Sequence, residues 1–88
     1  MSAEEIFQQR MRLGRLFDIY GGLLTEKQRN CLGLYFYDDL SLSEISEELG
    51  VSRQAVHDLL KRVEQILERY EVTLGVLAKE EALHQEMH

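Results

Sequence analysis

The chain has 88 residues with a single cysteine, no proline and a formal net charge of −6. A single cysteine excludes an internal disulfide and a thiolate cage for a metal, and no apolar run reaches the about 18 residues that a membrane span requires. Residues 1–10 lack the basic-then-apolar pattern of a signal peptide, so we expect a cytoplasmic protein without membrane insertion. Good helix formers dominate the composition, which favours one all-α domain over residues 1–88.

The first two predicted helices are marked by apolar spacing and by signals at their ends. One covers residues 3–20, where apolar side chains recur at helical spacing and a pair of glycines follows. The other covers residues 26–37 and begins after Thr25, which has the spacing of a capping box with Gln28. Inside this helix, Cys31 is expected to be a buried small hydrophobe rather than a reactive thiol.

The next predicted helix is short and covers residues 42–49. Ser41 and Glu44 have the spacing of a second capping box at its start, and Gly50 ends it. Its apolar face carries two residues that lie four positions apart, Ile45 and Leu49.

This short helix opens a predicted helix-turn-helix over residues 41–69. In that motif two helices meet at a sharp turn, so their facing positions must be apolar and the turn must tolerate a positive φ angle. Gly50 meets the second requirement, Val51 is expected to fill the turn, and Ser52 is the N-cap of the second helix. The first requirement is met by four facing positions: Ile45, Leu49, Val56 and Leu59.

An apolar series continues beyond the motif into a C-terminal extension over residues 70–88. Its steps alternate between four and three residues, through Val56, Leu60, Val63, Leu67, Tyr70, Leu74 and Leu77. Either the helix continues through Gly75 towards Leu77, or Gly75 ends it and a further helix covers residues 76–86. The series itself is either intramolecular core or, in its C-terminal half, a dimer seam made by Leu67, Tyr70, Leu74 and Leu77.

Two sets of short motifs connect the chain to known families. The first comprises Leu24–Arg29, Leu32, Leu34, Phe36, Leu42–Ile45, Leu49–Arg53 and Val56. With these residues the stretch from 24 to 67 resembles the region-4 domain of bacterial sigma factors. The second comprises Leu16–Gly21, Leu23–Gln28, Asp39–Ile45, Val51–Val56, Glu71, Leu74 and Gly75. Through these the chain is more similar still, over about residues 10–78, to the YlxM family of small bacterial helix-turn-helix proteins.

The resemblance implies a fold and a set of partners. The fold is a small helical bundle like sigma region 4, or like a winged helix without its wing, with a long C-terminal helix. Family members are usually described as DNA-binding or regulatory proteins and are expected to be homodimers. Their genes tend to neighbour those of the signal recognition particle, so the resemblance implies a part in that pathway and its components as partners.

The second helix of a helix-turn-helix enters the major groove of DNA, and its first residues meet base edges. On a helical wheel the polar face of this helix, with its N-cap, carries our candidates for DNA contact: Ser52, Arg53, Gln54, His57 and Lys61. Gln54 has the amide geometry to pair with adenine, and Arg53 suits guanine or phosphate. On the polar face of the first helix, Arg12 and Arg15 are candidates for further phosphate contacts.

Charge leaves two hypotheses open. Residues 52–70 form the only net-positive segment, with four basic and three acidic side chains. Asp58, in the middle of the polar face, would repel phosphates, as would the acids of the preceding helix, Glu44, Glu47 and Glu48. The chain is either a dimeric DNA-binding regulator or a protein or ribonucleoprotein adaptor. In an adaptor the helix-turn-helix would be a packing scaffold, and the acidic helix would meet a basic partner.

The sequence carries no motif for catalysis. It has neither a phosphate-binding glycine loop nor an HExxH helix, and the paired acids Asp38 and Asp39 fit a solvated turn. His84 and His88 have a spacing that can bind metal, but no third ligand accompanies them. We therefore expect no enzyme activity, metal, cofactor or small-molecule substrate.

Overall fold

The computed structural model describes residues 2–86, and within this range the regular elements are all helices. In chain order they are α1 (Ala3–Tyr20), the 3₁₀ turn η1 (Gly21–Leu23), α2 (Glu26–Phe36), α3 (Leu42–Leu49), α4 (Arg53–Leu74) and α5 (Val76–Glu86). The all-α prediction is confirmed, and the predicted bounds of α1 and α3 agree with the structure at both ends. Helix α2 ends at Phe36, one residue earlier than predicted.

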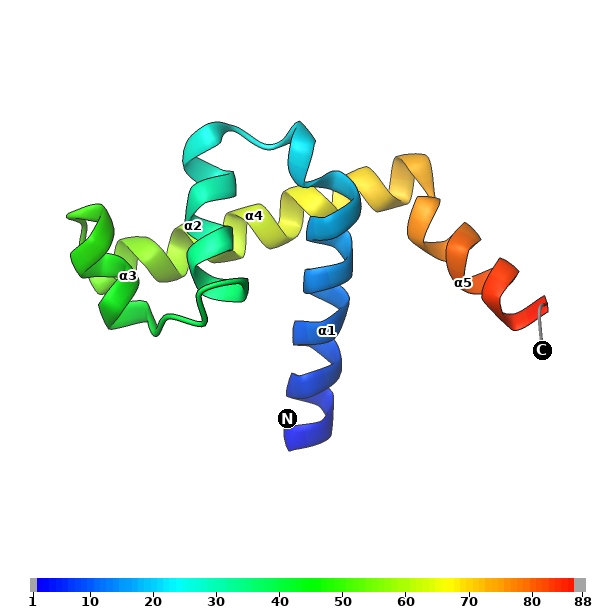
Figure 1. The fold of residues 1–88 in the computed structure, drawn as a ribbon, viewed down its shortest axis with the longest axis horizontal. Coiled ribbons are helices and arrows are strands. Elements are labelled where there is room, and N and C mark those ends of the chain that lie inside the picture. The colour runs from blue at the N-terminus through cyan, green and yellow to red at the C-terminus, as the bar shows by residue number, and fades with distance from the viewer. Residues whose placement is uncertain (1, 87–88) are drawn as a thin grey trace.

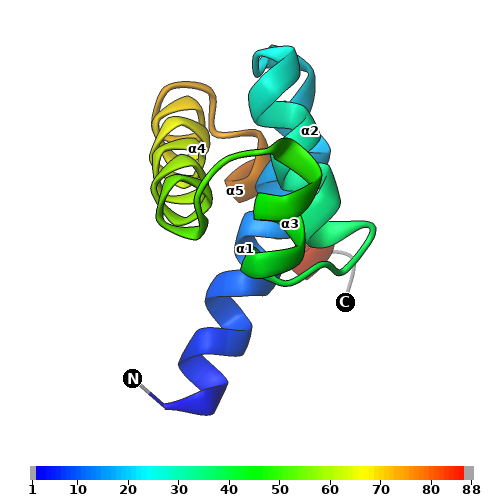
Figure 2. The same cartoon turned by 90° about the vertical axis from the view of Figure 1, so that its left-hand side faces the viewer.

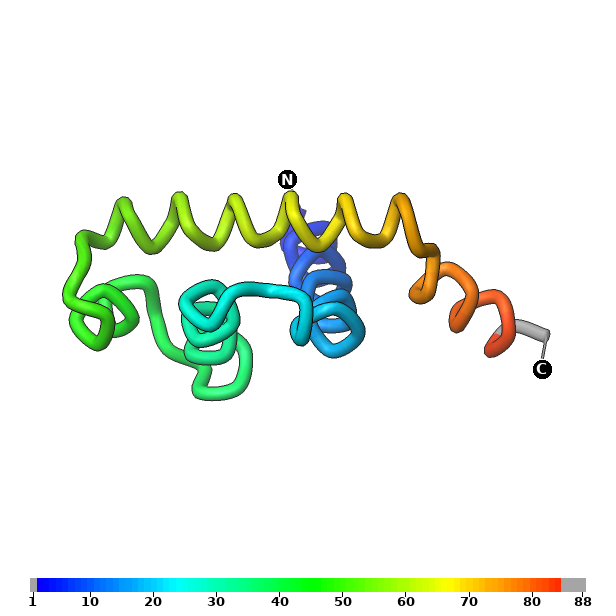
Figure 3. Tube along the Cα trace, turned by 90° about the horizontal axis from the view of Figure 1, so that it is seen from above, coloured from blue at the N-terminus to red at the C-terminus, as the bar shows by residue number. Residues whose placement is uncertain are grey.

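Helix α4 is the axis on which the other helices are arranged (Figure 1). Seen from above, it runs as a straight rod along one side of the molecule, with α1, α2 and α3 on the other side (Figure 3). Figure 2 shows the same two layers nearly end-on to α4. Helix α3 packs on the first half of α4, and α1 and α2 also pack against α4. One face of α4 is therefore left uncovered by the other helices.

Two adjoining apolar clusters hold the helices together. The larger joins α1, α2, α4 and α5 through Leu16, Phe17, Tyr20, Leu24, Leu32, Val63, Leu67 and Leu77. The smaller joins α2 to the helix-turn-helix through three fully buried residues, Cys31, Ile45 and Val56. Burial raises the pKa of the Cys31 thiol, in keeping with its predicted role as a small hydrophobe. Because Tyr35, Leu59 and Leu60 pack against both clusters, the helix-turn-helix is fixed to the rest of the fold.

Side-chain caps determine where the helices begin. The Oγ1 of Thr25 accepts from the Gln28 amide at 3.2 Å, while Oε1 of Gln28 accepts from the Thr25 amide at 3.0 Å. Ser41 and Glu44 make the same reciprocal pair at 3.1 and 3.0 Å. Both predicted capping boxes are therefore confirmed, and each satisfies amides that a helix start would otherwise leave without an acceptor.

Gly75 ends α4, so the helix does not continue towards Leu77. The φ angle of Gly75 is 65°, in the left-handed region that only glycine adopts without a steric penalty from Cβ. Helix α5 then leaves in a new direction (Figure 1). Of the two alternatives for this region, the continuous helix is wrong and the two-helix arrangement is confirmed.

The break at Gly75 interrupts the predicted seam of Leu67, Tyr70, Leu74 and Leu77. Leu67 and Leu77 are 0% and 1% exposed in the core of the single chain, and Tyr70 is half-buried against the same cluster. Among the four, Leu74 alone is well exposed, at 55%. A seam built from all four would require the chain's own core to open, so a homodimer, which stays a prediction, needs other surface.

The carboxylate of Glu71 holds α5 against α4. Glu71 is only 8% exposed and accepts from the Tyr20 hydroxyl at 2.6 Å and from the Leu77 and Ala78 amides at 3.0 Å each. The Tyr20 hydroxyl in turn accepts from the Val76 amide at 3.1 Å. These acceptors satisfy the first amides of α5, where a negative charge is also favourable.

Candidate nucleic-acid interface

The connection between α3 and α4 has the geometry of a helix-turn-helix. Gly50 has a φ angle of 69°, and the amides of Gly50 and Val51 both donate to the carbonyl of Ser46. Across the turn, Ile45 of α3 and Val56 of α4 are buried in one cluster. Val51 is 37% exposed, so it borders the turn rather than filling it as predicted.

The predicted DNA-contact residues lie close together at the start of α4. All five are exposed: Ser52, Arg53, Gln54, His57 and Lys61. The Ser52 hydroxyl accepts from the Ala55 amide at 3.0 Å, which leaves its own O–H available to an outside acceptor. Because the first amides of a helix have no intrahelical acceptor, this end of α4 also offers backbone donors to an anion.

Asp58 lies among these residues and contacts two of them. Its Oδ1 accepts from Nε2 of Gln54 at 2.9 Å and lies 3.5 Å from Nδ1 of His57. The Asp58 side chain is 68% exposed, so it remains in solvent. The carboxylate that the sequence marked as repulsive is therefore also a hydrogen-bond partner of Gln54.

Two basic residues that sequence reasoning missed flank the same surface. Lys27, in the first turn of α2, and Arg62, in α4, line one hollow together with Asp58, Leu49, Val51, Ala55 and Leu59. Both are exposed, and neither forms an ion pair with another described residue. Arg62 is next to Lys61 in the net-positive segment, and this position in the sequence could have identified it as a candidate for DNA contact. Nothing in the local pattern places Lys27 beside α4.

The arginines predicted to contact phosphates are paired with the chain's own acids. Nε and Nη2 of Arg12 donate to Glu68 at 2.8 and 3.0 Å, and this hydrogen bonding raises the pKa of Arg12. Arg15 lies 3.7 Å from Glu80 and 3.8 Å from Glu81. Contact with phosphates would require these pairs to open, so the geometry does not favour either arginine as a DNA contact.

The acidic residues of α3 fall into two groups. Glu44 is part of the cap, and the hydrogen bond from the Ser41 amide lowers the pKa of Glu44. Glu47 and Glu48 are exposed, and neither pairs with a base in the part of the chain that the structure describes. Helix α3 therefore presents negative charge next to the basic start of α4.

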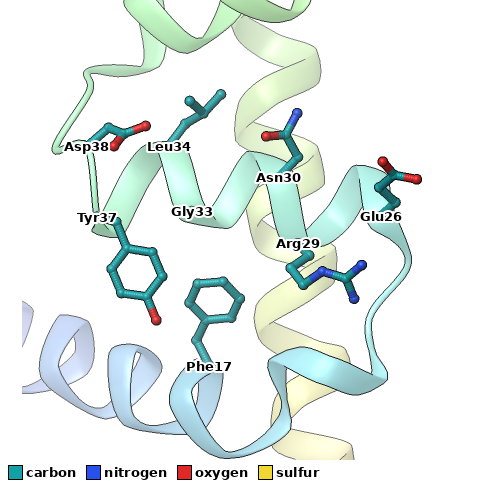
Figure 4. A pocket seen from close by; sticks show the side chains of 8 residues that line it. All are labelled: Phe17, Glu26, Arg29, Asn30, Gly33, Leu34, Tyr37 and Asp38. Atoms are coloured by element: carbon teal, nitrogen blue, oxygen red, sulfur yellow. The ribbon is translucent and has the colours of Figure 1, made fainter.

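A second hollow, of about 550 Å³, lies between α1 and α2 (Figure 4). Its lining residues are Phe17, Glu26, Arg29, Asn30, Gly33, Leu34, Tyr37 and Asp38. Two of its polar groups already serve the fold: the Tyr37 hydroxyl donates to Asp18 at 2.9 Å, and Arg29 donates to the Leu24 carbonyl at 3.2 Å. The lining does not set a nucleophile beside a base, so we assign no reaction to it.

Within residues 2–86, no three side chains of the metal-ligating types come together. His84 shares a hollow with Arg15, Glu80 and Glu81, and the positive charge of the Arg15 guanidinium would repel a metal cation there. His88 lies outside the described residues. Over the same range, no helix combines the length and the apolar character that a bilayer crossing demands.

The fold and the exposed start of α4 define a helix-turn-helix protein. The family model described as "Putative helix-turn-helix protein, YlxM / p13 like" matches residues 7–88. The chain belongs to this family, which carries the name UPF0122, and the resemblance to the YlxM family found in the sequence is thereby confirmed.

Relatives from three bacteria show the extent of the likeness. The UPF0122 protein of Halalkalibacterium halodurans is 58% identical over 69 residues, covering 78% of this chain and 63% of that protein. The one of Geobacillus kaustophilus is 50% identical over 80 residues, covering 91% and 73%. A Bacillus cereus relative is 53% identical over 74 residues, covering 84% and 67%. The chain thus spans less than two thirds of the first relative and somewhat more of the other two.

Proposed function

We propose that the chain is a DNA-binding regulator that places the start of α4 in the major groove. The observation that carries this proposal is a difference between two groups of basic side chains: those near the start of α4 form no ion pair, whereas those on α1 do. Around the start of α4 they are exposed and have no acidic partner among the described residues: Lys27, Arg53, Lys61 and Arg62. On α1 every arginine is paired with an acid of the chain itself. Unpaired cations favour a phosphate backbone because binding releases its counterions.

The chemistry of each side chain on this surface fits a separate role. The amide of Gln54 matches the N6 and N7 edge of adenine, and the guanidinium of Arg53 matches O6 and N7 of guanine. Lys27 and Arg62, on the flank, supply charge for phosphates, and the Ser52 hydroxyl supplies a further donor. Two exposed residues extend the same region of α4, His57 and Lys61.

The charge of the whole chain sets the expected strength of binding. A net charge of −6 opposes approach to a duplex, and the exposed acids of α3 lie beside the site. With about three phosphates neutralised by lysine or arginine, the logarithm of the binding constant should fall by roughly 2.7 for a tenfold rise in salt. We therefore expect measurable binding at low salt and a steep loss as salt rises.

Selection of duplexes from a random pool, at about 0.1 M salt where exposed charges are screened beyond roughly 10 Å, tests this proposal. The test variant is Arg53→Ala with Gln54→Ala. The matched control is Gln65→Ala with Arg69→Ala, which removes the same two exposed residue types from the same helix, roughly 16 to 24 Å further along. Wild type and control should enrich a common motif, and the test variant should lose it without a change in its thermal midpoint.

Two outcomes would contradict different parts of the proposal. If the Arg53→Ala and Gln54→Ala variant keeps the motif, α4 does not read the bases. If wild type enriches no duplex at any salt concentration, the chain does not bind DNA as proposed.

A second candidate function is a protein or ribonucleoprotein adaptor, which the exposed and unpaired Glu47 and Glu48 favour. On this proposal α3 meets a basic partner by charge complementarity, and the family resemblance points to components of the signal recognition particle. Binding to purified components at low salt should then survive Arg53→Ala with Gln54→Ala and be lost with Glu47→Gln and Glu48→Gln. No binding by wild type would count against the adaptor.

A further inference from the structure

The start of α4 carries one residue that opposes DNA binding, and its contacts show what else it does. Asp58 is 68% exposed on the face that would meet the duplex, where a carboxylate repels phosphates. It lies one turn after Gln54, and its Oδ1 accepts from Nε2 of Gln54 at 2.9 Å. Side chains four residues apart on a helix are neighbours, so this pair forms within α4 alone and needs no other element.

The chemistry of the carboxylate decides which way the Gln54 amide is turned. An ionised carboxylate accepts hydrogen bonds and cannot donate them, so the NH₂ end of the amide must face Asp58. The carbonyl oxygen Oε1 then points away from Asp58, and the second N–H of Nε2 stays available. Gln54 thus presents an acceptor and a donor in a fixed order.

This fixed order matches one purine and not the other. Adenine offers the N6 donor and the N7 acceptor in the major groove, which an amide can pair with bidentately, whereas guanine offers two acceptors, O6 and N7. An amide that is free to rotate loses less binding affinity when guanine replaces adenine, because its NH₂ end can turn to face whichever acceptor is present.

We propose that Asp58 is the specificity-determining positioning residue of this interface. It holds the Gln54 amide in the orientation that reads adenine, and its charge keeps binding to unmatched duplexes weak. This inference rests on the proposed DNA-binding function. The inference predicts that removing Asp58 raises the affinity for a random duplex and lowers the preference for adenine over guanine.

The experiment uses the full chain, the duplex enriched by wild type, the same duplex with guanine in place of the adenine assigned to Gln54, and a random duplex. Asp58→Ala should bind the random duplex about twofold to fivefold more tightly, because one repulsive charge is lost. It should also lose the adenine preference, which a bidentate pair makes about fivefold to 150-fold. Gln54→Ala should lose the same preference, and Asp58→Ala should remove nothing more in that background.

Two further variants separate positioning from charge and from folding. Asp58→Asn removes the charge and can also donate from its own NH₂ to Oε1 of Gln54, so the Gln54 amide is no longer held in one orientation. This variant should gain random-duplex affinity and lose most of the adenine preference. Glu64→Ala removes an equal charge nearly three turns beyond Gln54 and should leave the preference unchanged. Thermal midpoints should stay within a few degrees for all variants, because Asp58 is exposed and lies outside both clusters.

The outcomes distinguish this inference from the function on which it rests. Full adenine preference in Asp58→Ala would overturn the positioning role while leaving DNA binding intact. Full adenine preference in Asp58→Asn would also overturn it, because a group that can donate would then serve as well as the acceptor-only carboxylate. If wild type shows no preference among duplexes, the proposed function itself is overturned and the role of Asp58 with it.

Discussion

The buried carboxylate of Glu71 joins three helices through its partners on α1 and α5. The hydrogen bond from Tyr20, together with those from the Leu77 and Ala78 amides, holds the pKa of Glu71 below its ordinary value, against the opposing effect of burial. A group with a lowered folded-state pKa contributes stability above its unfolded pKa, about 4.3 for glutamate. That contribution is lost as the pH falls through the folded value.

We expect Glu71→Gln to lower the free energy of unfolding at pH 7 by about 1 to 3 kcal/mol, because hydrogen bonds to a charged acceptor become bonds to a neutral one. Wild type should lose stability as the pH falls below about 5, through the ordinary glutamate pKa and then through the lowered folded-state pKa, and the variant should lose less over the same range. Urea unfolding of both proteins across this range measures both effects. The lowered pKa of Glu44 acts equally in the two proteins and cancels in the comparison. Equal slopes would show that Glu71 does not hold α5.

The sequence predicted side-chain hydrogen bonds between residues that are close in the chain. It did not predict those between residues that are distant in the chain. Ser41 and Glu44 are three residues apart, so their spacing alone predicts the capping box. Glu71 and Tyr20 are 51 residues apart. Tyr20 falls on the apolar face of α1, and no local pattern indicates that its hydroxyl needs an acceptor on α4.

At the scale of elements, two leucines of the predicted seam have opposite environments at the junction of α4 and α5: Leu77 is buried and Leu74 is exposed. Leu77→Ala should lower the free energy of unfolding by about 2 to 5 kcal/mol, because it opens a cavity in the larger apolar cluster, which relaxes only partly around the missing atoms. Leu74→Ala deletes the same atoms from a side chain that is 55% exposed and should change stability by about 0.5 kcal/mol or less. Urea midpoints of the two variants provide the measurement.

The reverse order of these two effects would contradict the fold at this junction. It would mean that Leu74 is covered, as the continuous seam required, and that Leu77 is not. The sequence left this choice open because a glycine inside a helix costs only about 1 kcal/mol, which a long seam could offset. Contacts far along the chain decide it: Leu77 enters the core formed by α1, and its amide is satisfied by Glu71.

At the scale of the whole molecule, tertiary contacts sort the basic residues into paired and unpaired groups. On a helical wheel Arg12 and Lys61 are equivalent, since each lies on the polar face of an amphipathic helix. The fold brings Glu68, 56 residues away, against Arg12 and brings no acid to Lys61 within the described residues. The exposure of the candidate DNA-contact residues on α4 could therefore be predicted from the sequence, whereas the position of Lys27 beside α4 and the ion pairs of the α1 arginines could not.

The homodimer stays a prediction and belongs to this scale, because we expect it to use a surface away from the interrupted seam. Three large apolar side chains in the first half of α1 are exposed: Ile6 at 53%, Phe7 at 61% and Met11 at 54%. Exposed apolar groups that lie close together are typical of association surfaces. We expect light scattering to give twice the mass of the chain, and Ile6→Ser with Phe7→Ser to give the monomer.

The control for this prediction is Leu23→Ser with Val72→Ser, which places the same polar groups at two exposed positions outside α1, 58% and 85% exposed in wild type. It should remain dimeric, since neither side chain belongs to the α1 surface. A monomeric wild type at all concentrations would contradict the homodimer, and dissociation of the control alone would place the interface elsewhere. A dimer would present two copies of α4, and paired recognition helices bind half-sites about one helical turn, roughly 34 Å, apart. The spacing of repeats in any selected duplex therefore gives an independent measure of the same assembly.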